Sequence, residues 1–257
     1  MDKNKIKRLV DSMSQLTEGQ IYWVDEIIQQ FNRPYSFNKN PKSNLVTEEF
    51  LQNFGDTLRI YHCFSNLPFT KYTFEYAMDR VPKLSGYKSE LATTGNPGHD
   101  ITINNIKYSL KTQADKSLNR NKIHISKFME LGRGHWDSDV NDFIGLRDQF
   151  FHHLESYDRI LSLRALDKAS PSDIEGSWMY ELVEIPKKLL MESRNGIVSM
   201  TESSTPPKSG FCKVYNGKEL KFQLYFDGGG ERKLQIQHIN KKYCTVHATW
   251  SFSVHCL

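Results

Sequence analysis

Residues 95–113 read GNPGHDITINNIKYSLKTQ, and this stretch decides the fold expected for the chain. Residues 100–103 and 106–113 alternate polar and apolar side chains, which is the pattern of β-strands with one buried face. Asn104 and Asn105 lie between them, and asparagine tolerates the positive φ that a two-residue hairpin turn requires. The stretch therefore predicts a tight antiparallel hairpin.

The two-residue turn fixes which side chains of the hairpin share a face. It places Asp100 opposite Ser109, and directly opposed residues of an antiparallel pair point to the same side. Because strand side chains alternate, one face carries Asp100, Ser109, Lys111 and Gln113. The sequence therefore predicts a carboxylate, a hydroxyl and an ammonium group together near the open end of the hairpin.

These groups suit chemistry on a phosphate. Asp100 can ligate Mg²⁺, which prefers oxygen ligands, and the backbone carbonyl of Leu110 can serve as another ligand. A bound metal lowers the pKa of its water and polarises the phosphate. Lys111 can hold the attacking water and stabilise the negative charge that develops. Glycines at 95 and 98 allow a sharp bend before Asp100 and leave room for DNA.

This arrangement resembles the PD-(D/E)XK nuclease family, which includes most type II restriction enzymes and the mismatch-repair nicking endonuclease. The family motif is an Asp at the start of one strand, then an acidic residue, any residue and a lysine on the next. Asp100 and the Ser109-Leu110-Lys111 run match it, although Pro97 lies three residues before the Asp rather than directly before it. The order of helices and strands extends the resemblance over residues 69–131.

Ser109 stands where the family usually has Asp or Glu, and a serine cannot supply a second negative charge. Some restriction enzymes of this family have serine here and recruit a glutamate from the helix that follows. Residues 123–131, IHISKFMEL, are expected to provide that helix, with Glu130 as the glutamate. Glu75, on the helix before the hairpin, and Glu90, on the strand before the glycine loop, are the other candidates. We favour Glu75 and Glu130.

The rest of the chain predicts helices first, a mixed centre and a β-rich end. Apolar spacings of three and four indicate helices at 6–16, 19–31, 48–64, 70–81 and 142–161. Alternation indicates strands at 88–93, 178–185, 221–227, 232–239 and 244–254, whereas 33–44 is expected to be a polar loop.

These elements predict an α/β fold. We expect a restriction-endonuclease-like core with a central mixed β-sheet flanked by helices and a β-rich C-terminal part. Residues 1–257 are expected to form a single nuclease domain, with a helical part at 1–68, a catalytic core at 69–165 and a β-rich part at 166–257.

Two segments are candidates for DNA contact. Residues 116–127, KSLNRNKIHISK, are basic, and lysine and arginine bind phosphates; the candidates are Lys116, Arg120, Lys122, Lys127 and, just beyond, Arg133. A predicted hairpin in the C-terminal third carries Arg232, Lys233, Gln235 and Gln237, which are side chains of the types that read base edges. A solvated loop and an ordinary exposed strand are the alternative interpretations.

The composition fits a folded protein kept in the cytoplasm. The chain has 257 residues, 38% of them hydrophobic and 25% charged, with a net charge of +4. It has no apolar run long enough to cross a membrane and no secretory leader at its N-terminus. The cysteines, at 63, 212, 244 and 256, lack the spacing of a zinc site and are expected to be reduced thiols.

The resemblance implies a type II restriction endonuclease that uses Mg²⁺ to hydrolyse double-stranded DNA at a specific site. A homodimer is expected, because cutting both strands of a symmetric site needs two active sites. A cognate DNA methyltransferase is expected to be encoded nearby. A repair, nicking or mobile-element nuclease with the same core remains an alternative, and Ser109 keeps open a non-catalytic DNA-binding protein with a decayed core. A serine hydrolase is less favoured because the chain lacks a GxSxG elbow.

Overall fold

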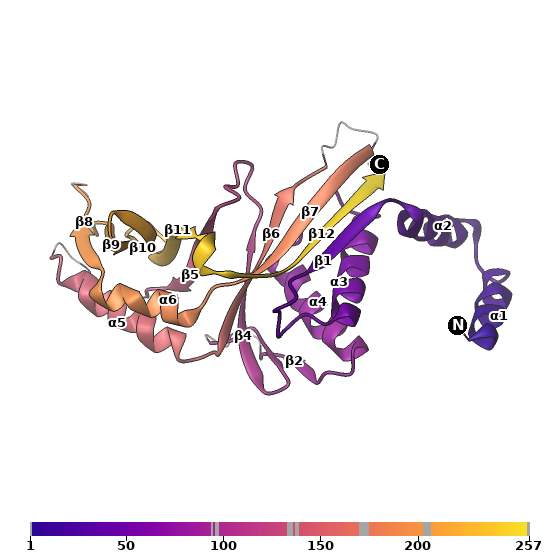
Figure 1. Ribbon diagram of the computed structural model, residues 1–257, viewed down its shortest axis with the longest axis horizontal. Helices are drawn as coiled ribbons and strands as arrows, with labels where there is room; N and C mark the ends of the chain where they lie inside the picture. Colours follow the sequence, from indigo (N-terminus) through magenta and orange to yellow (C-terminus); the bar gives the residue numbers. More distant parts are fainter. Residues whose placement is uncertain are drawn as a thin grey trace.

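Two β-sheets form the framework of the protein in the computed structural model, which describes residues 2–93, 95, 98–132, 136, 139–169, 175–202 and 207–255 (Figure 1). The larger sheet has seven strands in the order β1-β12-β7-β6-β4-β3-β2 and the smaller has five in the order β5-β11-β10-β9-β8. In the larger sheet, β4 and β6 are parallel and the other pairs are antiparallel. The larger sheet is therefore mixed, as predicted.

The strand bounds are as follows. The larger sheet contains β1 (Tyr35–Lys39), β2 (Ser89–Leu91), β3 (Ile101–Ile103), β4 (Ile106–Gln113), β6 (Arg159–Asp167), β7 (Glu175–Glu184) and β12 (Thr245–His255). The smaller sheet contains β5 (Lys122–Glu130), β8 (Ile197–Met200), β9 (Gly210–Asn216), β10 (Glu219–Asp227) and β11 (Lys233–Asn240). The second half of the chain is thus rich in strands, in agreement with the sequence pattern.

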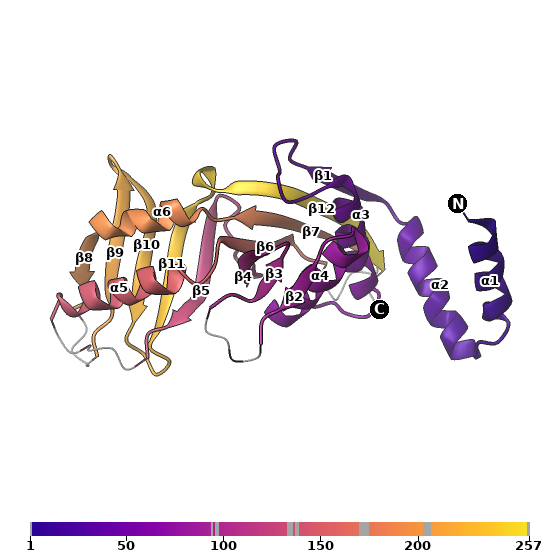
Figure 2. The ribbon, with the colours of Figure 1, turned by 90° about the horizontal axis from the view of Figure 1, so that it is seen from below.

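Each sheet has its own helices and its own hydrophobic core. Helices α3 (Glu48–Tyr61) and α4 (Lys71–Leu84) cover one face of the larger sheet, and α5 (Asp142–Leu154) and α6 (Lys187–Met191) cover one face of the smaller (Figure 2). Two separate clusters of buried apolar side chains lie beneath these helix pairs. Helices α1 (Lys3–Met13) and α2 (Glu18–Asn32) extend beyond the larger sheet (Figure 1).

The hairpin that the sequence predicted has the expected register. Ile101 pairs with Tyr108 and Ile103 with Ile106 in the antiparallel β3–β4 pair. The two turn residues, at positions 104 and 105, have φ values of 48° and 65°. Both therefore occupy the left-handed region that a tight two-residue turn needs.

Local sequence also sets the start of the helix before the hairpin. The Thr70 side chain caps α4 by accepting a hydrogen bond of 3.2 Å from the backbone N–H of Thr73. Phe74, Met78 and Val81 then lie on one helix face and are buried against the larger sheet. This anchoring leaves the first turn of α4 at the open end of the hairpin.

Two secondary-structure predictions were wrong. Residues 33–44 were expected to be a loop, but β1 pairs with β12 as an edge strand, since Tyr35 and Phe37 alternate with polar residues. Residues 123–131 were expected to be helical, but β5 is a strand that pairs with β11. A β-bulge in that pair brings both Ile125 and Phe128 inward, so their spacing of three resembles that of a helix.

The remaining expectations concern the boundaries of the chain's parts. The helix predicted at 142–161 ends at Leu154, and β6 begins at Arg159. The single-domain organisation stays a prediction, and the structure contains two separate hydrophobic cores.

Cys63, Cys212 and Cys244 are free thiols, and Cys256 lies outside the described residues. In the described part of the chain, no helix is long and apolar enough to span a membrane.

A partly buried ionic cluster joins the larger sheet to the loop after β1. The Glu184 carboxylate accepts hydrogen bonds from Arg159 and, at 2.8 Å, contacts Nε2 of His247. His247 Nδ1 lies 2.8 Å from the Ser43 hydroxyl. Burial by itself raises the pKa of Glu184, but the hydrogen bonds from His247 and Arg159 outweigh it and lower the pKa to about 2.

We predict that Glu184 makes the stability of the protein sensitive to acid. Its pKa is lower in the folded state than the ordinary value of 4.5, so its contribution is complete above pH 4.5 and is lost as the pH falls towards 2. Glu184→Gln is expected to lower the free energy of unfolding by about 2 kcal/mol at neutral pH, after allowance for solvent screening. Urea unfolding measured from pH 7 down to pH 3 should show the difference in free energy of unfolding between wild type and Glu184→Gln becoming smaller. Exposed Glu202→Gln serves as the control, and a pH-independent difference for Glu184→Gln would contradict the prediction.

Candidate active site

The open end of the hairpin gathers the predicted polar groups around Asp100. The Oδ2 atom of Asp100 accepts a hydrogen bond of 2.6 Å from the backbone N–H of Leu110 and one of 3.4 Å from the Ser109 hydroxyl. The backbone N–H of Asp100 donates to the carbonyl of Tyr108 at 2.8 Å. These bonds continue the strand register and hold the carboxylate beside β4.

Helix α4 adds two charged groups to this carboxylate. The Lys71 ammonium lies 2.8 Å from Oδ1 of Asp100 and 3.3 Å from Oε1 of Glu75, so it bridges the two carboxylates. Burial acts to lower the pKa of Lys71, but its hydrogen bond and attraction to Asp100 and its contact with Glu75 outweigh burial and raise it. A positive charge is thus held between Asp100 and Glu75.

Lys111 is the third charged group and is the least hydrated. Withdrawal of its ammonium from water lowers its pKa to about 8, although the Asp100 carboxylate opposes that change. The ammonium lies 5.4 Å from the centre of the Phe128 ring, on β5. Burial and the nearby Lys111 charge lower the pKa of His153 to about 4, so this imidazole is neutral. Lys111 therefore keeps most of its charge at neutral pH in a weakly hydrated environment.

A neighbouring hydroxyl lies in the same surroundings. The Tyr157 ring packs edge-on against Phe128, with ring centres 6.5 Å apart. Burial raises the pKa of the phenol, and the negative charge of Asp100 raises it further. Its hydroxyl is buried without a hydrogen-bond partner among the described residues. Buried polar groups of native proteins are usually hydrogen-bonded, so this unpaired oxygen is unusual.

An open cleft of about 300 Å³ lies beside these groups. Its lining comes from α4, β4 and β5 and consists of Lys71, Lys111, Thr112, Ile125, Ser126, Lys127, Phe128 and Met129. Three of these side chains are lysines, so the cleft presents a concentration of positive charge. Such a lining suits a phosphate backbone.

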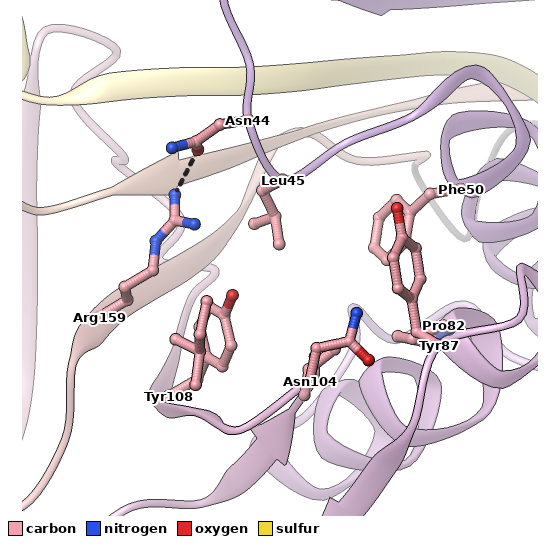
Figure 3. Close-up of a pocket in the computed structure, with 10 residues that line it drawn as sticks. Asn44, Leu45, Phe50, Pro82, Tyr87, Asn104, Tyr108 and Arg159 are labelled. Atoms are coloured by element: carbon pink, nitrogen blue, oxygen red, sulfur yellow. Dashed lines mark hydrogen bonds between the residues drawn. The ribbon is translucent and has the colours of Figure 1, made fainter.

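A second hollow lies at the other end of the hairpin and is separate from this site (Figure 3). It measures about 100 Å³ and is lined in part by Asn104 of the turn, Tyr108 and Leu45. In the close-up, Arg159 reaches Asn44 across its rim. The charged groups described above lie at the open end of the hairpin instead.

The structure brings some predicted catalytic residues together and separates others. Asp100, Ser109, Leu110, Lys111 and Glu75 lie around one point, as expected from the hairpin register. Gln113 follows Ser109 and Lys111 in the unbroken register of β4, as expected, and its side chain accepts a hydrogen bond of 2.9 Å from the buried guanidinium of Arg164. Gln113 therefore belongs to a structural network.

The other two glutamates have different surroundings. Glu130 does not come from a helix, as was expected, but ends β5, where it forms an ion pair of 2.9 Å with Lys127 and is 71% exposed. Glu90 lies on β2 opposite Thr102 and is exposed. Glu75, whose carboxylate shares the Lys71 ammonium with Asp100, is therefore the glutamate that the contacts favour.

Lys71 was missed by the sequence analysis. Its only sequence signal is the spacing of four residues to Glu75, which is typical of an ordinary surface ion pair on a helix. Its contact with Asp100 depends on the packing of α4 against the hairpin. That contact is tertiary, so no local pattern indicates it.

The basic residues predicted to contact DNA are distributed over the cleft and its surroundings. Lys127 lines the cleft, Lys122 starts β5, and Lys116 is exposed in the loop between β4 and β5. Arg120 forms an ion pair with Asp167. Arg133 lies outside the described residues.

The predicted C-terminal hairpin is formed by β10 and β11, and its polar face is ordered by side-chain hydrogen bonds. Gln223 donates to Gln237, Gln237 to Gln235, and Gln235 to Asp227, at 2.8, 2.9 and 3.1 Å. Core residues Leu224 and Leu234 point to the opposite face, under the helices. Gln235 and Gln237 therefore share a face with Lys233, as predicted, while Arg232 lies in the turn with its guanidinium 6.0 Å from the ring centre of Trp136.

The donor set at Asp100 fits a hard divalent cation. The Asp100 and Glu75 carboxylates and the carbonyl of Leu110 are oxygen donors, and Mg²⁺ is commonly held by one or two carboxylates together with water and substrate phosphate. The bridging Lys71 ammonium demonstrates that a cation is accommodated between the carboxylates. Among the described residues, no group of three or more His, Cys, Asp or Glu side chains is placed to hold a metal without substrate.

Comparison with known sequences defines the class of protein. The sequence model of a family described as "SmaI: Type II site-specific deoxyribonuclease" matches residues 9–252. The chain belongs to this family of type II restriction endonucleases and is an endodeoxyribonuclease, an enzyme that acts on DNA.

A curated relative is also described as a type II restriction enzyme. The chain is 44% identical over 212 residues to "Type II restriction enzyme SmaI" of Serratia marcescens, an alignment that covers 81% of this chain and 82% of the relative. No solved structure matches the chain significantly.

We predict that Lys71 competes with a divalent cation for Asp100 and Glu75. Lys71→Met removes the competing charge, so Mn²⁺ should bind the DNA-free protein about fivefold more tightly, equivalent to about 1 kcal/mol. Binding can be followed by calorimetry and by the electron paramagnetic resonance of free Mn²⁺. Lys83→Met is the matched control, because Lys83 lies on the same helix and pairs with Asp79 at 2.7 Å. Weaker Mn²⁺ binding by Lys71→Met than by wild type would show that the ammonium does not compete.

Proposed function

We propose that this restriction endonuclease belongs to the PD-(D/E)XK type and requires Mg²⁺ to hydrolyse double-stranded DNA at a specific site. The observation that carries the proposal is the position of Asp100. Its carboxylate lies against the backbone of Leu110 and shares a cation with Glu75, next to a cleft lined by three lysines. A carboxylate pair beside concentrated positive charge suits a metal and a phosphodiester together.

In this proposal, each residue at the hairpin end has a defined task. Asp100, Glu75 and the carbonyl of Leu110 would hold the metal, which would supply an activated water and polarise the phosphate. Lys111 positions the attacking water and stabilises the charge that develops on the phosphate, because its poorly hydrated ammonium interacts strongly with an anion. Ser109 orients Asp100 through its hydroxyl.

Glu75 replaces the acidic residue that Ser109 does not provide. Its distance of 3.3 Å from the Lys71 ammonium that also binds Asp100 supports this assignment. Glu130, which the sequence analysis also favoured, has as its partner Lys127 on the same strand. We therefore assign the metal site to Glu75 and give Glu130 no part in it.

DNA contacts are proposed on two surfaces. The lysines of the cleft and the basic β4–β5 loop bind phosphates near the cut. The polar face of β10 and β11 reads base edges, because the hydrogen-bonded glutamines present fixed donors and acceptors. The complete enzyme is proposed to be a cytoplasmic homodimer, with a cognate DNA methyltransferase encoded nearby.

Cleavage of plasmid DNA by purified variants tests this assignment of residues. With Mg²⁺, wild type is expected to give discrete fragments, which EDTA abolishes. Asp100→Ala, Lys111→Ala and Glu75→Gln should each reduce the rate at least about a hundredfold, because they remove metal binding or transition-state stabilisation.

Two matched controls accompany these variants. Glu130→Gln and Asp79→Asn should leave the rate within about threefold of wild type, since Asp79 lies on the same helix as Glu75 but pairs with Lys83. A large loss in Glu130→Gln with little loss in Glu75→Gln would reverse the assignment. Nicked circles alone would indicate a nicking nuclease, and DNA binding without cleavage would indicate a decayed core.

A further inference from the structure

The two N-terminal helices carry an unusual amount of exposed apolar surface. Leu9 and Val10 are 57% and 60% exposed, and α1 contains no buried residue. The exposed large apolar side chains of this face are Ile6, Leu9, Val10 and Met13 on α1 and Ile21 and Ile28 on α2. Contiguous apolar surface of this extent marks an interaction site in a folded protein.

These side chains form one stripe on each helix. On α1 their spacing is three, four and seven residues, which places them on a single side. On α2 the opposite side faces the body of the protein, where Trp23 contacts Phe64 with ring centres 5.1 Å apart and Gln30 donates to the carbonyl of Ser253 at 2.7 Å. The stripe of Ile21 and Ile28 on α2 therefore lies on the side opposite to these contacts, whereas Phe31 lies against the body, with its ring centre 5.3 Å from the Arg59 guanidinium.

Packing of α1 and α2 within one chain does not cover the stripes. The two helices are neighbours joined by a short turn (Figure 2), yet all six side chains remain at least 37% exposed. Helix α2 is also held firmly at its C-terminal end, because the buried Arg59 guanidinium donates to the carbonyl of Gln30 at 2.5 Å and lies 5.3 Å from the Phe31 ring centre. The anchored α2 and its neighbour α1 thus present an open apolar face that suits a partner from another molecule.

The charges beside the stripes indicate what that partner is. Lysines 3, 5 and 7 border the stripe of α1, whereas Glu18 and Asp25 border the stripe of α2. One helix therefore offers an apolar band with basic edges and the other an apolar band with acidic edges. The two surfaces are complementary, and a second copy of the same chain presents both.

We propose that helices α1 and α2 form the dimer interface of this enzyme, with α1 of each subunit packed against α2 of the other. A two-fold axis then pairs the basic and acidic borders twice, and the four helices bury both stripes in one bundle. This inference rests on the homodimer of the proposed function and adds the surface through which it forms. It does not depend on the assignment of the catalytic residues.

Sedimentation velocity of the full-length protein, without DNA or metal, tests the interface. Wild type at micromolar concentration is expected to have twice the chain mass of 29.9 kDa. Leu9→Glu with Val10→Glu should raise the dissociation constant at least about a hundredfold and give a monomer, because it places charge in the apolar stripe. Arg8→Glu, on the opposite side of α1, should remain a dimer. The midpoint temperature at which the core unfolds should be unchanged, since neither Leu9 nor Val10 is buried.

Charge reversal tests the pairing of the helices. Lys3→Glu, Lys5→Glu and Lys7→Glu together should weaken the dimer, and adding Glu18→Lys and Asp25→Lys to the same chain should restore it. A monomeric wild type, a dimer that tolerates Leu9→Glu with Val10→Glu, or a failure of the compensating changes to restore the dimer would each overturn the inference. So would a monomer that binds vesicles of anionic lipid, which would make the stripe a membrane contact.

The failure of this inference is distinguishable from failure of the proposed function. A protein that dimerises through α1 and α2 but does not cleave DNA would overturn the nuclease mechanism and leave the interface intact. A monomer that cleaves DNA in an Asp100-dependent manner would do the reverse.

Discussion

The register of the β3–β4 hairpin is the constraint on which the rest of the site depends. A two-residue turn, with both of its asparagines in the left-handed region, allows one pairing of the strands. That pairing brings the Asp100 carboxylate to the backbone N–H of Leu110 at 2.6 Å. A slip by one residue would turn Lys111 into the core beneath α3 and α4 and bring Leu110 to the site, so the same constraint specifies both the chemistry and the packing.

Charge at the site is balanced between elements that are far apart in the chain. Lys71 joins the α4 carboxylate of Glu75 to Asp100 before any metal is bound, and this avoids leaving two carboxylates uncompensated. A metal that replaces the ammonium would free Lys71 to face the phosphate in a cleft that it already lines. The Lys71 side chain thus compensates both carboxylates in the fold without metal.

The cleft exists because the two sheets are held side by side. Arg164 on β6 forms a buried ion pair with Glu181 and donates to the carbonyls of Asn119 and Lys122, at the start of β5, at 2.7 and 2.8 Å. These bonds fix the first strand of the smaller sheet beside β4, so that Phe128 and Lys127 form the far wall of the cleft. A buried ion pair that lost one partner would be costly, and this gives the junction a defined geometry.

The sequence by itself determined the hairpin, the faces of its strands and the grouping of Asp100, Ser109 and Lys111, because turn chemistry and alternation act over a few residues. It also indicated Glu75 without distinguishing it from Glu130. Only the tertiary structure brings Glu75 to the Lys71 ammonium that also binds Asp100 and places Glu130 on a strand, because the approach of α4 to the hairpin and the pairing of β5 with β11 are contacts between distant segments. The same holds for Lys71, whose local pattern fits an ordinary surface ion pair equally well, and for the strand at residues 35–39, whose pattern also fits a loop. It holds too for the uncovered faces of α1 and α2, whose pattern also fits helices packed within their own chain.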